Sequence, residues 1–509
     1  MVRTLILVMA LSLVIMGCSQ DSEPVSPSPG GTSRALAKPG GGKSALDLIE
    51  DDYDAGLLEK NTACLYREYA VSSPDNLPAK YRSSAIGKDA TYSMLQIAKS
   101  WNELSGSTRK EITEIRANGF GVLKESFTTA HFVLHYATQS HFGVPAQDND
   151  ADGIPDFIEV AAESWEEVWT REVSQLGFVS PKHTPGQKFH VYYKDMPYYG
   201  YTVPEDVELL ALSPVPYGTA AAWIAVENDF YGFPRNDEDV TGMEPIRSGA
   251  LKVTQAHEFM HAVQFNINVY QSGWLMESTA TWAEDAVYGN VNDWHWYVDY
   301  FLRTPDYPIF SRYAYGSAFF ITYLTERYGT DLVRRVWDAA KTQSTPDAVR
   351  SIAFGGTWEP MKSFAPAEYL LDLADFEIPS VIPQPTNVIR AAHSAYPVSV
   401  QVQPSTNKAA NRAPWGLGAN FIEFYPANSS SLTLTFDGMD GFAWRAMVVA
   451  TPAKGNSPPT VWEIPLNGSS AGTFTVAGIG TRWGVVTLIP TIVDRAGSEV
   501  PFAYTAEVH

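Results

Sequence analysis

The sequence predicts an α+β fold that is followed by an all-β module at the C-terminal end. Strand-like apolar segments occur at residues 131–136, 189–193 and 222–226, with an amphipathic helix at 155–176 after the first of them. Apolar helices dominate from 249 to 341, and short strands separated by turn residues fill the chain beyond 388. With 509 residues the chain exceeds the size of one compact core, so more than one domain is expected.

The first 18 residues have the features of an export signal. Arg3 precedes an apolar run from Leu5 to Met16, which is too short to span a bilayer, and the run ends at Gly17-Cys18. A small residue directly before a cysteine at this place resembles the lipobox of bacterial lipoproteins. The resemblance implies cleavage before Cys18, lipidation of Cys18, and an extracytoplasmic protein whose contact with the membrane is the lipid anchor. Met16 departs from the usual pattern, so ordinary secretion stays as the alternative.

Composition and turn residues divide the remaining chain. Residues 1–18 are the predicted signal peptide and 19–44 a flexible tether rich in Ser, Pro and Gly. Residues 45–126 form a polar helical region, either a packing region, which we favour, or a propeptide. The predicted catalytic unit, the Pro-containing linker and the β-sandwich occupy 127–378, 379–387 and 388–509.

The charge balance excludes one class of partner. The formal net charge is −21, from 57 acidic and 36 basic residues. Proteins that bind nucleic acid usually carry a basic surface, so we expect no nucleic-acid partner.

A metal-binding motif lies in the apolar helix that begins near residue 249. Within His257-Glu258-Phe259-Met260-His261 the two histidines stand one helical turn apart and to one side of the apolar stripe. Their rings can therefore converge on one zinc ion, while Glu258 projects beside them as a general base for an activated water. Catalytic zinc sites use three protein ligands and keep one open position, so a third ligand is needed.

The downstream sequence resembles the gluzincin type of zinc metallopeptidase. In that group a later helix supplies a glutamate, often within Trp-Leu-x-Glu-(small)-x-Ala, and this chain has Trp274-Leu-Met-Glu277-Ser-Thr-Ala280. The stretch from Phe127 to about Ala340 also resembles a bacterial family of secreted metalloproteases known mainly from predicted genes. The resemblance implies a zincin-like, two-lobed domain, with Glu277 as third ligand and Glu284 as its rival or as a partner that orients a histidine. It also makes Tyr313, Tyr315 and His295 candidates for a hydrogen-bond donor to the reacting carbonyl oxygen.

An acidic segment matches the twelve-residue calcium loop of EF-hands. Carboxylates stand at positions one, three, five, nine and twelve, and glycine stands at position six. The predicted ligands of a structural Ca²⁺ are the side chains or carbonyl of Asp148, Asp150, Asp152, Ile154, Asp156 and Glu159. Pro155 and the lack of a second loop distinguish the segment from paired EF-hands, and an acidic turn that caps a helix is the alternative.

These features together favour a secreted or surface-anchored zinc endopeptidase that acts on protein or peptide. The competing interpretation is a non-catalytic surface-binding lipoprotein on a zincin scaffold, whose C-terminal β-sandwich binds a surface ligand. An intact His257-Glu258-His261 set disfavours it. A third possibility is a zinc hydrolase of another bond, such as an ester.

Overall fold

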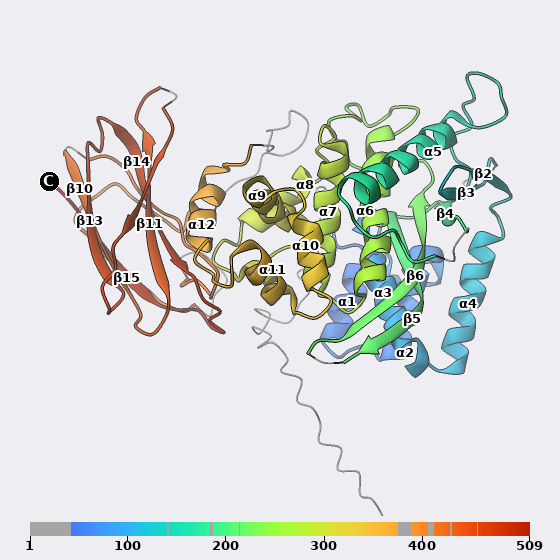
Figure 1. Cartoon of the computed structure of the whole chain (residues 1–509), viewed down its shortest axis with the longest axis horizontal. Coiled ribbons are helices and arrows are strands. Elements are labelled where there is room, and N and C mark those ends of the chain that lie inside the picture. Colours follow the sequence, from blue (N-terminus) through green and yellow to red (C-terminus); the bar gives the residue numbers. More distant parts are fainter. Residues whose placement is uncertain are drawn as a thin grey trace, which may run out of the picture.

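The computed structural model describes residues 42–139, 142–183, 187–212, 214–374, 388–405, 412–427, 430–455 and 457–509. The fold class is α+β, as predicted, and a strand-rich C-terminal part follows it (Figure 1). Within these residues, Figure 1 shows the C-terminal strands at one end of the molecule and the mixed sheet with its helices at the other. Cys18, the signal peptide, most of the tether and the predicted linker at 379–387 lie outside the described residues.

The N-terminal region is helical and packs against one face of the mixed sheet. Its first helix begins with a capping box, in which the Ser44 hydroxyl accepts from Asp47 N and the Asp47 carboxylate accepts from Ser44 N. A shared apolar core joins the helices to Tyr201, Val203 and Trp223 of the sheet. The elements are α1 (Ala45–Asp54), α2 (Lys60–Ser72), α3 (Thr91–Ser100), α4 (Gly106–Phe120) and three short 3-10 turns, η1 (Pro74–Asn76), η2 (Ala79–Tyr81) and η3 (Trp101–Glu103).

The mixed sheet has six strands in the order β1-β5-β6-β4-β3-β2. Strands β3, β4 and β6 are parallel, β5 is antiparallel to β6, and β1 at the edge runs parallel to β5. Alternate residues face opposite cores, because Ile224 and Val226 pack on the second side whereas Trp223 and Ala225 pack toward the N-terminal helices. The strands are β1 (Gly87–Asp89), β2 (Glu125–Thr128), β3 (Phe132–Tyr136), β4 (Phe189–Lys194), β5 (Tyr198–Ala211) and β6 (Tyr217–Glu227).

The second face of the sheet is covered by α5 and α6. Helix α5 (Asp156–Trp169) continues as a π-helical turn, η4 (Thr170–Gln175), so the predicted 155–176 helix changes type near its end. Helix α6 (Ser248–Ile267) is buried along almost its whole length and contacts β5, β6, α5 and α7 (Gly273–Tyr288). Helix α6 is therefore the central element of this core, although it carries polar side chains such as Gln255, His257 and Glu258 that are buried with it.

Further helices complete the α-rich half. They are α8 (His295–Leu302), η5 (Ile309–Ser311), η6 (Tyr315–Ser317), α9 (Ala318–Tyr328), α10 (Leu332–Ala339), α11 (Thr345–Ala353) and α12 (Met361–Leu370). In the described part of the chain, no helix is both long enough and apolar enough to cross a membrane.

The C-terminal part consists of two sheets with an apolar core of its own. Their strand orders are β13-β10-β15-β8 and β12-β11-β14-β9-β7. The apolar core includes Leu434, Trp444, Val448, Leu488 and Phe502. The strands are β7 (Ala391–His393), β8 (Val398–Val402), β9 (Ile422–Phe424), β10 (Ser431–Gly438), β11 (Trp444–Pro452), β12 (Thr460–Ile464), β13 (Ala471–Ala477), β14 (Trp483–Ile492) and β15 (Phe502–Val508).

Candidate metal centre

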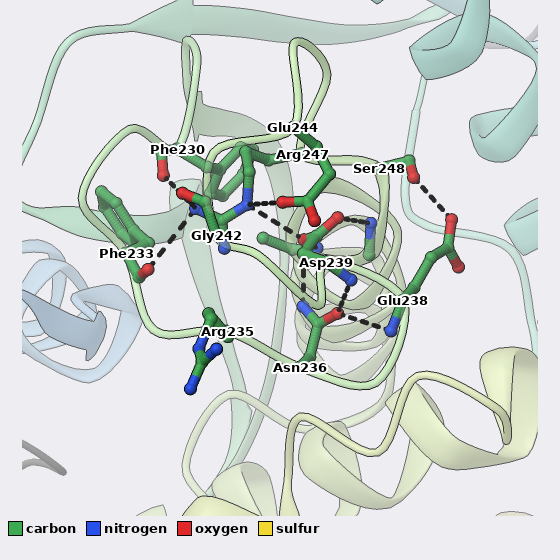
Figure 2. A network of polar contacts seen from close by, with 12 residues as sticks. Phe230, Phe233, Arg235, Asn236, Glu238, Asp239, Gly242, Glu244, Arg247 and Ser248 are labelled. Carbon is green, nitrogen blue, oxygen red and sulfur yellow. Dashed lines mark hydrogen bonds and ion pairs between the residues drawn. The ribbon is translucent and has the colours of Figure 1, made fainter. Parts of the chain in front are cut away.

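The start of α6 is fixed by a folded loop that precedes it. Asp239 accepts hydrogen bonds from Gly249 N at 3.0 Å and Ala250 N at 2.8 Å. These two amides belong to the first helical turn and have no acceptor within the helix. Buried Arg247 donates to the carbonyl oxygens of Phe230, Phe233, Pro234 and Gly242 and lies 3.4 Å from the Asp239 carboxylate. Figure 2 shows this network around the first turn of the helix. The loop therefore sets the position from which α6 presents its polar side chains.

Both histidines of the motif are held through their Nδ1 atoms. His257 Nδ1 lies 2.7 Å from Glu284 Oε1, and His261 Nδ1 lies 2.8 Å from Gln264 Oε1. Both partners offer acceptor oxygens, so each Nδ1 carries a proton and each Nε2 is left to face a metal ion, toward which a neutral ring presents a lone pair. The two Nε2 atoms lie 3.1 Å apart in a fully buried place. Two facing lone pairs require a cation or a proton between them.

Glu277 from α7 completes a convergent set of three side chains. Its Oε2 lies 3.4 Å from His257 Nε2 and 3.5 Å from His261 Nε2, and neither carboxylate oxygen has a hydrogen-bond partner although both are buried. A buried carboxylate without hydrogen bonds is costly unless a positive charge faces it. Two imidazole nitrogens and one carboxylate are also the donor set of many catalytic zinc sites. The residues present therefore fit a zinc ion.

A fourth side chain, Asp89 of β1, joins this group and was not predicted from the sequence. One ligand atom each from Asp89, His257, His261 and Glu277 lies within 4.8 Å of the other three. The Asp89 carboxylate also accepts from Thr91 N at 2.9 Å and from the Thr91 hydroxyl at 2.7 Å. An Asp-x-Thr pattern before a helix is typical of a helix cap. The local sequence therefore predicts a capping role for Asp89 and not a metal ligand.

Glu258 is held close to the group but is not one of its members. Its Oε2 accepts from the hydroxyls of Thr91 at 2.9 Å and Thr202 at 2.8 Å. The close approach of β5 requires Gly200, because a Cβ there would lie 2.9 Å from both Glu258 Cγ and Thr254 Cγ2. The carboxylate is consequently oriented by two hydroxyl donors from outside α6.

The charges in the site shift the pKa values of its members strongly. Burial by itself lowers the pKa of His257, but the facing carboxylates of Glu277 and Glu284 outweigh it and raise the pKa to about 10. Burial raises the pKa of Glu277, but His261 and His257 outweigh it and lower the pKa to about 2. Burial and the neighbouring charges of Glu258 and Glu277 raise the pKa of Asp89 well above its ordinary value. Three carboxylates in one buried place favour a bound cation.

A buried lysine connects the N-terminal region to the partner of His257. Lys88 Nζ lies 3.0 Å from Glu284 Oε2 and 2.7 Å from Asp293 Oδ2, and all three side chains are almost inaccessible to solvent. Glu284 thus uses one oxygen for His257 and the other for Lys88. Glu284 therefore lies on the Nδ1 side of His257, whereas Glu277 lies on the side of the two Nε2 atoms.

The aromatic donor candidates lie at different distances from the group. The Tyr315 ring centroid lies 6.0 Å from that of His257, and the Tyr313 ring packs behind Tyr315 at 5.6 Å. His295 packs against Trp294 at 4.5 Å, and burial lowers its pKa to about 3. Of the three, Tyr315 is the residue in ring contact with a motif histidine.

The predicted calcium loop brings three of its carboxylates together. Ligand atoms of Asp148, Asp150 and Asp152 lie within 4.8 Å of one another, and Gly153 adopts φ +92° at the sharp turn. Asp156 lies outside this group and accepts from Asn149 N at 2.9 Å. Ile154 N donates to Asp152 Oδ1 at 2.8 Å, a hydrogen bond within the loop.

Glu159, the last predicted calcium ligand, also lies outside the group of three. Partial burial and then the charges of Asp150, Asp152, Asp156 and Asp148 raise its pKa, so it faces the same acidic loop. Calcium at this loop stays a prediction.

The fold and the site together define an α+β protein in which two neighbouring buried helices bring two histidines and a glutamate to one point. The chain belongs to a family described as a "Family of unknown function (DUF6055)", whose sequence model matches residues 118–489. That range contains His257, Glu258, His261 and Glu277 and begins after Asp89.

Comparisons with other known proteins add little. A search of curated proteins found no match. Among solved structures, the pre-peptidase C-terminal domain of a collagenase from Bacillus anthracis has 7% identity, covers 24% of this chain and 99% of its own, with a TM-score of 0.16. The periplasmic inhibitor of g-type lysozyme from Aeromonas hydrophila, PliG, has 10% identity and a TM-score of 0.15. The match covers 24% of this chain and 100% of the inhibitor. A family GH115 4-O-methyl-α-glucuronidase has 11% identity and a TM-score of 0.15. The match covers 52% of this chain and 40% of the glucuronidase.

Proposed function

We propose that this chain is a zinc-dependent endopeptidase that hydrolyses peptide bonds in protein or peptide substrates. The observation that carries the proposal is the buried convergence of His257 Nε2, His261 Nε2 and the Glu277 carboxylate, whose oxygens make no hydrogen bond. These three residues would hold the zinc ion, and Glu284 and Gln264 would keep the imidazoles in the required tautomer. When bound there, zinc supplies a Lewis acid that polarises a carbonyl group and acidifies water toward neutral pH.

Glu258 is the residue proposed to move protons. Its carboxylate is buried beside the ligands, and hydroxyl groups of Thr91 and Thr202 fix one of its oxygens. It would take a proton from the attacking water and then deliver it to the leaving amine, as general bases in hydrolases do. Tyr315, which lies against His257, is the proposed donor to the carbonyl oxygen as negative charge develops on it.

We also propose that the enzyme works outside the cytoplasm, either anchored through a lipid on Cys18 or secreted. The support is the apolar run that ends at Gly17-Cys18 and the Ser/Pro/Gly-rich segment that follows it. Its substrates would then be extracellular proteins or peptides. A surface ligand for the C-terminal β-sandwich stays a prediction.

One observation favours the alternative of a non-catalytic protein on the same scaffold. Asp89 is a fourth candidate ligand, and zinc sites with four protein ligands are usually structural. A test of function must therefore include a chain in which Asp89 is replaced.

The test is the substitution Glu258→Gln, made in the natural chain and in an Asp89→Ala chain. Zinc content should stay near one ion per chain, whereas hydrolysis of a proteome-derived peptide library should fall by at least about a hundredfold, the scale of general-base contributions. Exposed Glu163 on α5 offers a matched control, Glu163→Gln, which should change neither quantity. Chelator should abolish the cleavage. Chelator-resistant cleavage, or substantial activity without the Glu258 carboxylate, contradicts the proposal.

A further inference from the structure

We propose that β1 and Asp89 form a plug that keeps the metal site closed in the folded chain, so that the site opens only when β1 moves away. This inference rests on the proposed function, because it concerns access of water and substrate to the same three ligands. The plug is defined as β1, residues 87–89; Thr91, whose hydroxyl contacts Glu258, is not part of it.

The Asp89 carboxylate lies where a fourth ligand to the metal would lie. One of its oxygens lies within 4.8 Å of a ligand atom of each of His257, His261 and Glu277. The amide and the hydroxyl of Thr91 fix the orientation of the carboxyl group. The Thr91 hydroxyl lies 2.7 Å from Asp89 Oδ1 and 2.9 Å from Glu258 Oε2, and its one proton is donated to one of the two at a time, so Asp89 and the proposed base are joined through one hydroxyl group. A carboxylate at this point competes with a water molecule that must lie between the metal and Glu258.

The backbone of β1 lies where an extended substrate would add to the sheet. β5 is the strand that faces α6 beside Glu258, through Gly200 and Thr202. Peptides commonly bind proteins by adding a strand to such an edge. Here β1 takes the outer side of β5, with Gly87 N donating to Pro197 O at 2.7 Å and Ala90 N donating to Gly200 O at 3.3 Å.

A buried ion pair holds the plug in place. Lys88 contacts Glu284 at 3.0 Å and Asp293 at 2.7 Å and also lies over the Tyr199 ring at 4.7 Å. Removal of one member of a buried charge cluster is strongly unfavourable, so displacement of β1 costs free energy that a trigger must supply. The same cluster contains Glu284, so the plug is coupled to the orientation of His257.

The plug also belongs to a different part of the chain from the other ligands. The three ligands and Glu258 lie inside the region that the family model matches, whereas the plug precedes it. The N-terminal region is attached to the sheet along a shared apolar core, and Leu46 N donates to the Tyr198 hydroxyl at 3.2 Å. A separate segment that inserts a carboxylate and an edge strand has the properties of a built-in inhibitor.

Acetohydroxamate is the probe, because it binds zinc only where coordination positions are open. Binding is measured by calorimetry to the full chain loaded with one zinc ion. Asp89→Ala should bind acetohydroxamate at least about 100-fold more tightly than the natural chain, a difference of about 2.7 kcal/mol. Asp75→Ala, which removes an exposed carboxylate from the same region, should behave like the natural chain.

Cobalt substitution of the natural chain provides a measurement that needs no variant. The Co²⁺ absorption spectrum should be that of a four-coordinate site and should not change when millimolar acetohydroxamate is added. If the natural chain binds acetohydroxamate as tightly as Asp89→Ala, or if its cobalt spectrum responds to the probe, the plug is ruled out.

Peptide cleavage separates this inference from the proposed function. If Asp89→Ala gains acetohydroxamate binding and also gains cleavage, both proposals are supported. If it gains acetohydroxamate binding but cleaves nothing, and a chain with both Lys88→Ala and Asp89→Ala, in which β1 is also released from Glu284 and Asp293, cleaves nothing either, the plug stands and the peptidase proposal fails. If the natural chain already binds the probe and cleaves peptides, the peptidase proposal stands and the plug fails.

Discussion

Glu277 and Glu284 lie on one helix and contact the same histidine from opposite sides. Glu277 Oε2 faces His257 Nε2 at 3.4 Å, whereas Glu284 Oε1 accepts from His257 Nδ1 at 2.7 Å. Their separation of seven residues corresponds to two helical turns, which places both on one face of α7. A direct ligand and an orienting residue should respond very differently to truncation.

Truncation of each glutamate therefore tests the ligand assignment. Glu277→Ala should weaken zinc binding far more than Glu284→Ala, for which a loss of about 10–100-fold is typical of orienting partners. Competition with a chromogenic chelator measures both affinities, and Glu163→Ala is the control. The reverse order of the two effects would transfer the ligand role to Glu284.

A second residue-scale feature is the buried carboxyl group of Glu227 at the end of β6. Burial and the charge of Asp229 raise its pKa to about 8, although the amides of Phe230 and Asp229 donate to it. The unfolded chain has an ordinary glutamate pKa, about 4.3, so the folded state binds this proton more tightly. The resulting stabilisation is complete below about pH 4.3 and is lost as the pH rises through about 8.

Glu227→Gln removes this titration while it keeps the shape of the side chain. The melting temperature of the natural chain, relative to that of Glu227→Gln, should fall between pH 5 and pH 9. Thermal unfolding of both proteins in matched buffers measures the difference, and Glu163→Gln should show none. A constant difference across this range would mean that the folded and unfolded pKa values of Glu227 are equal.

At the scale of elements, the acidic loop at 148–159 leads directly into α5, and α5 packs on the metal-binding helix. Gln255 of α6 donates to Ala161 O at 3.2 Å, and the Tyr288 hydroxyl of α7 donates to Ser164 O at 3.0 Å. A cation in the loop would offset the repulsion between Asp148, Asp150 and Asp152 and would fix the start of α5. We expect the effect to be structural, because the loop supplies no ligand to the His257 group.

Asp148→Ala combined with Asp152→Ala tests this role. A ligand that binds only the folded state, at a hundred times its dissociation constant, adds about 2.7 kcal/mol of stability. The double variant should melt at a lower temperature in millimolar calcium and should lose the calcium dependence of melting, with its zinc content unchanged. If the natural chain has the same melting temperature in calcium and in a calcium-selective chelator, the loop is an acidic turn that binds no calcium.

At the scale of the whole molecule, the C-terminal sandwich is attached to the α-rich half by a buried charge cluster. The guanidinium groups of Arg390 and Arg412 both pair with the carboxylate of Asp306, which is inaccessible to solvent. Backbone bonds continue the contact, since Trp415 N donates to Asp306 O at 2.9 Å and Ala419 N donates to Pro305 O at 2.8 Å. Helix α12 also packs against β11 and β14, so the two parts share an extended interface.

Asp306→Ala should uncouple the two parts. It removes the carboxylate that the guanidinium groups of Arg390 and Arg412 share, and breaking a buried pair in this way costs about 3–5 kcal/mol. Scanning calorimetry should then show two separated unfolding transitions where the natural chain shows one. Asp440→Ala, at an exposed aspartate of the sandwich, is the control, and a single transition in Asp306→Ala would show that the apolar interface alone couples them.

The sequence by itself determined the α+β class and the core of the candidate site. The His257-Glu258-His261 motif could be recognised because an i, i+4 spacing on an apolar helix is a local property, and the helix forms as predicted. Glu277 came from resemblance alone, since nothing local fixes how two helices pack. The sequence offered less for β5, which was not predicted because its first half is buried on both faces and so shows no alternation, and its second half is exposed.

Only the tertiary structure decided which other side chains reach the metal group. Asp89 belongs to a strand of three residues, which is too short to show a hydrophobic alternation. It reaches the histidines because β1 pairs with β5, a strand that contacts α6. The two hydroxyl partners of Glu258, from Thr91 and Thr202, likewise come from separate elements. The physical reason is the same in each case: periodicity and propensity act over a few residues, whereas sheet register and helix packing bring together groups that lie 56 residues apart, as for Thr202 and Glu258, or 167 apart, as for Thr91 and Glu258.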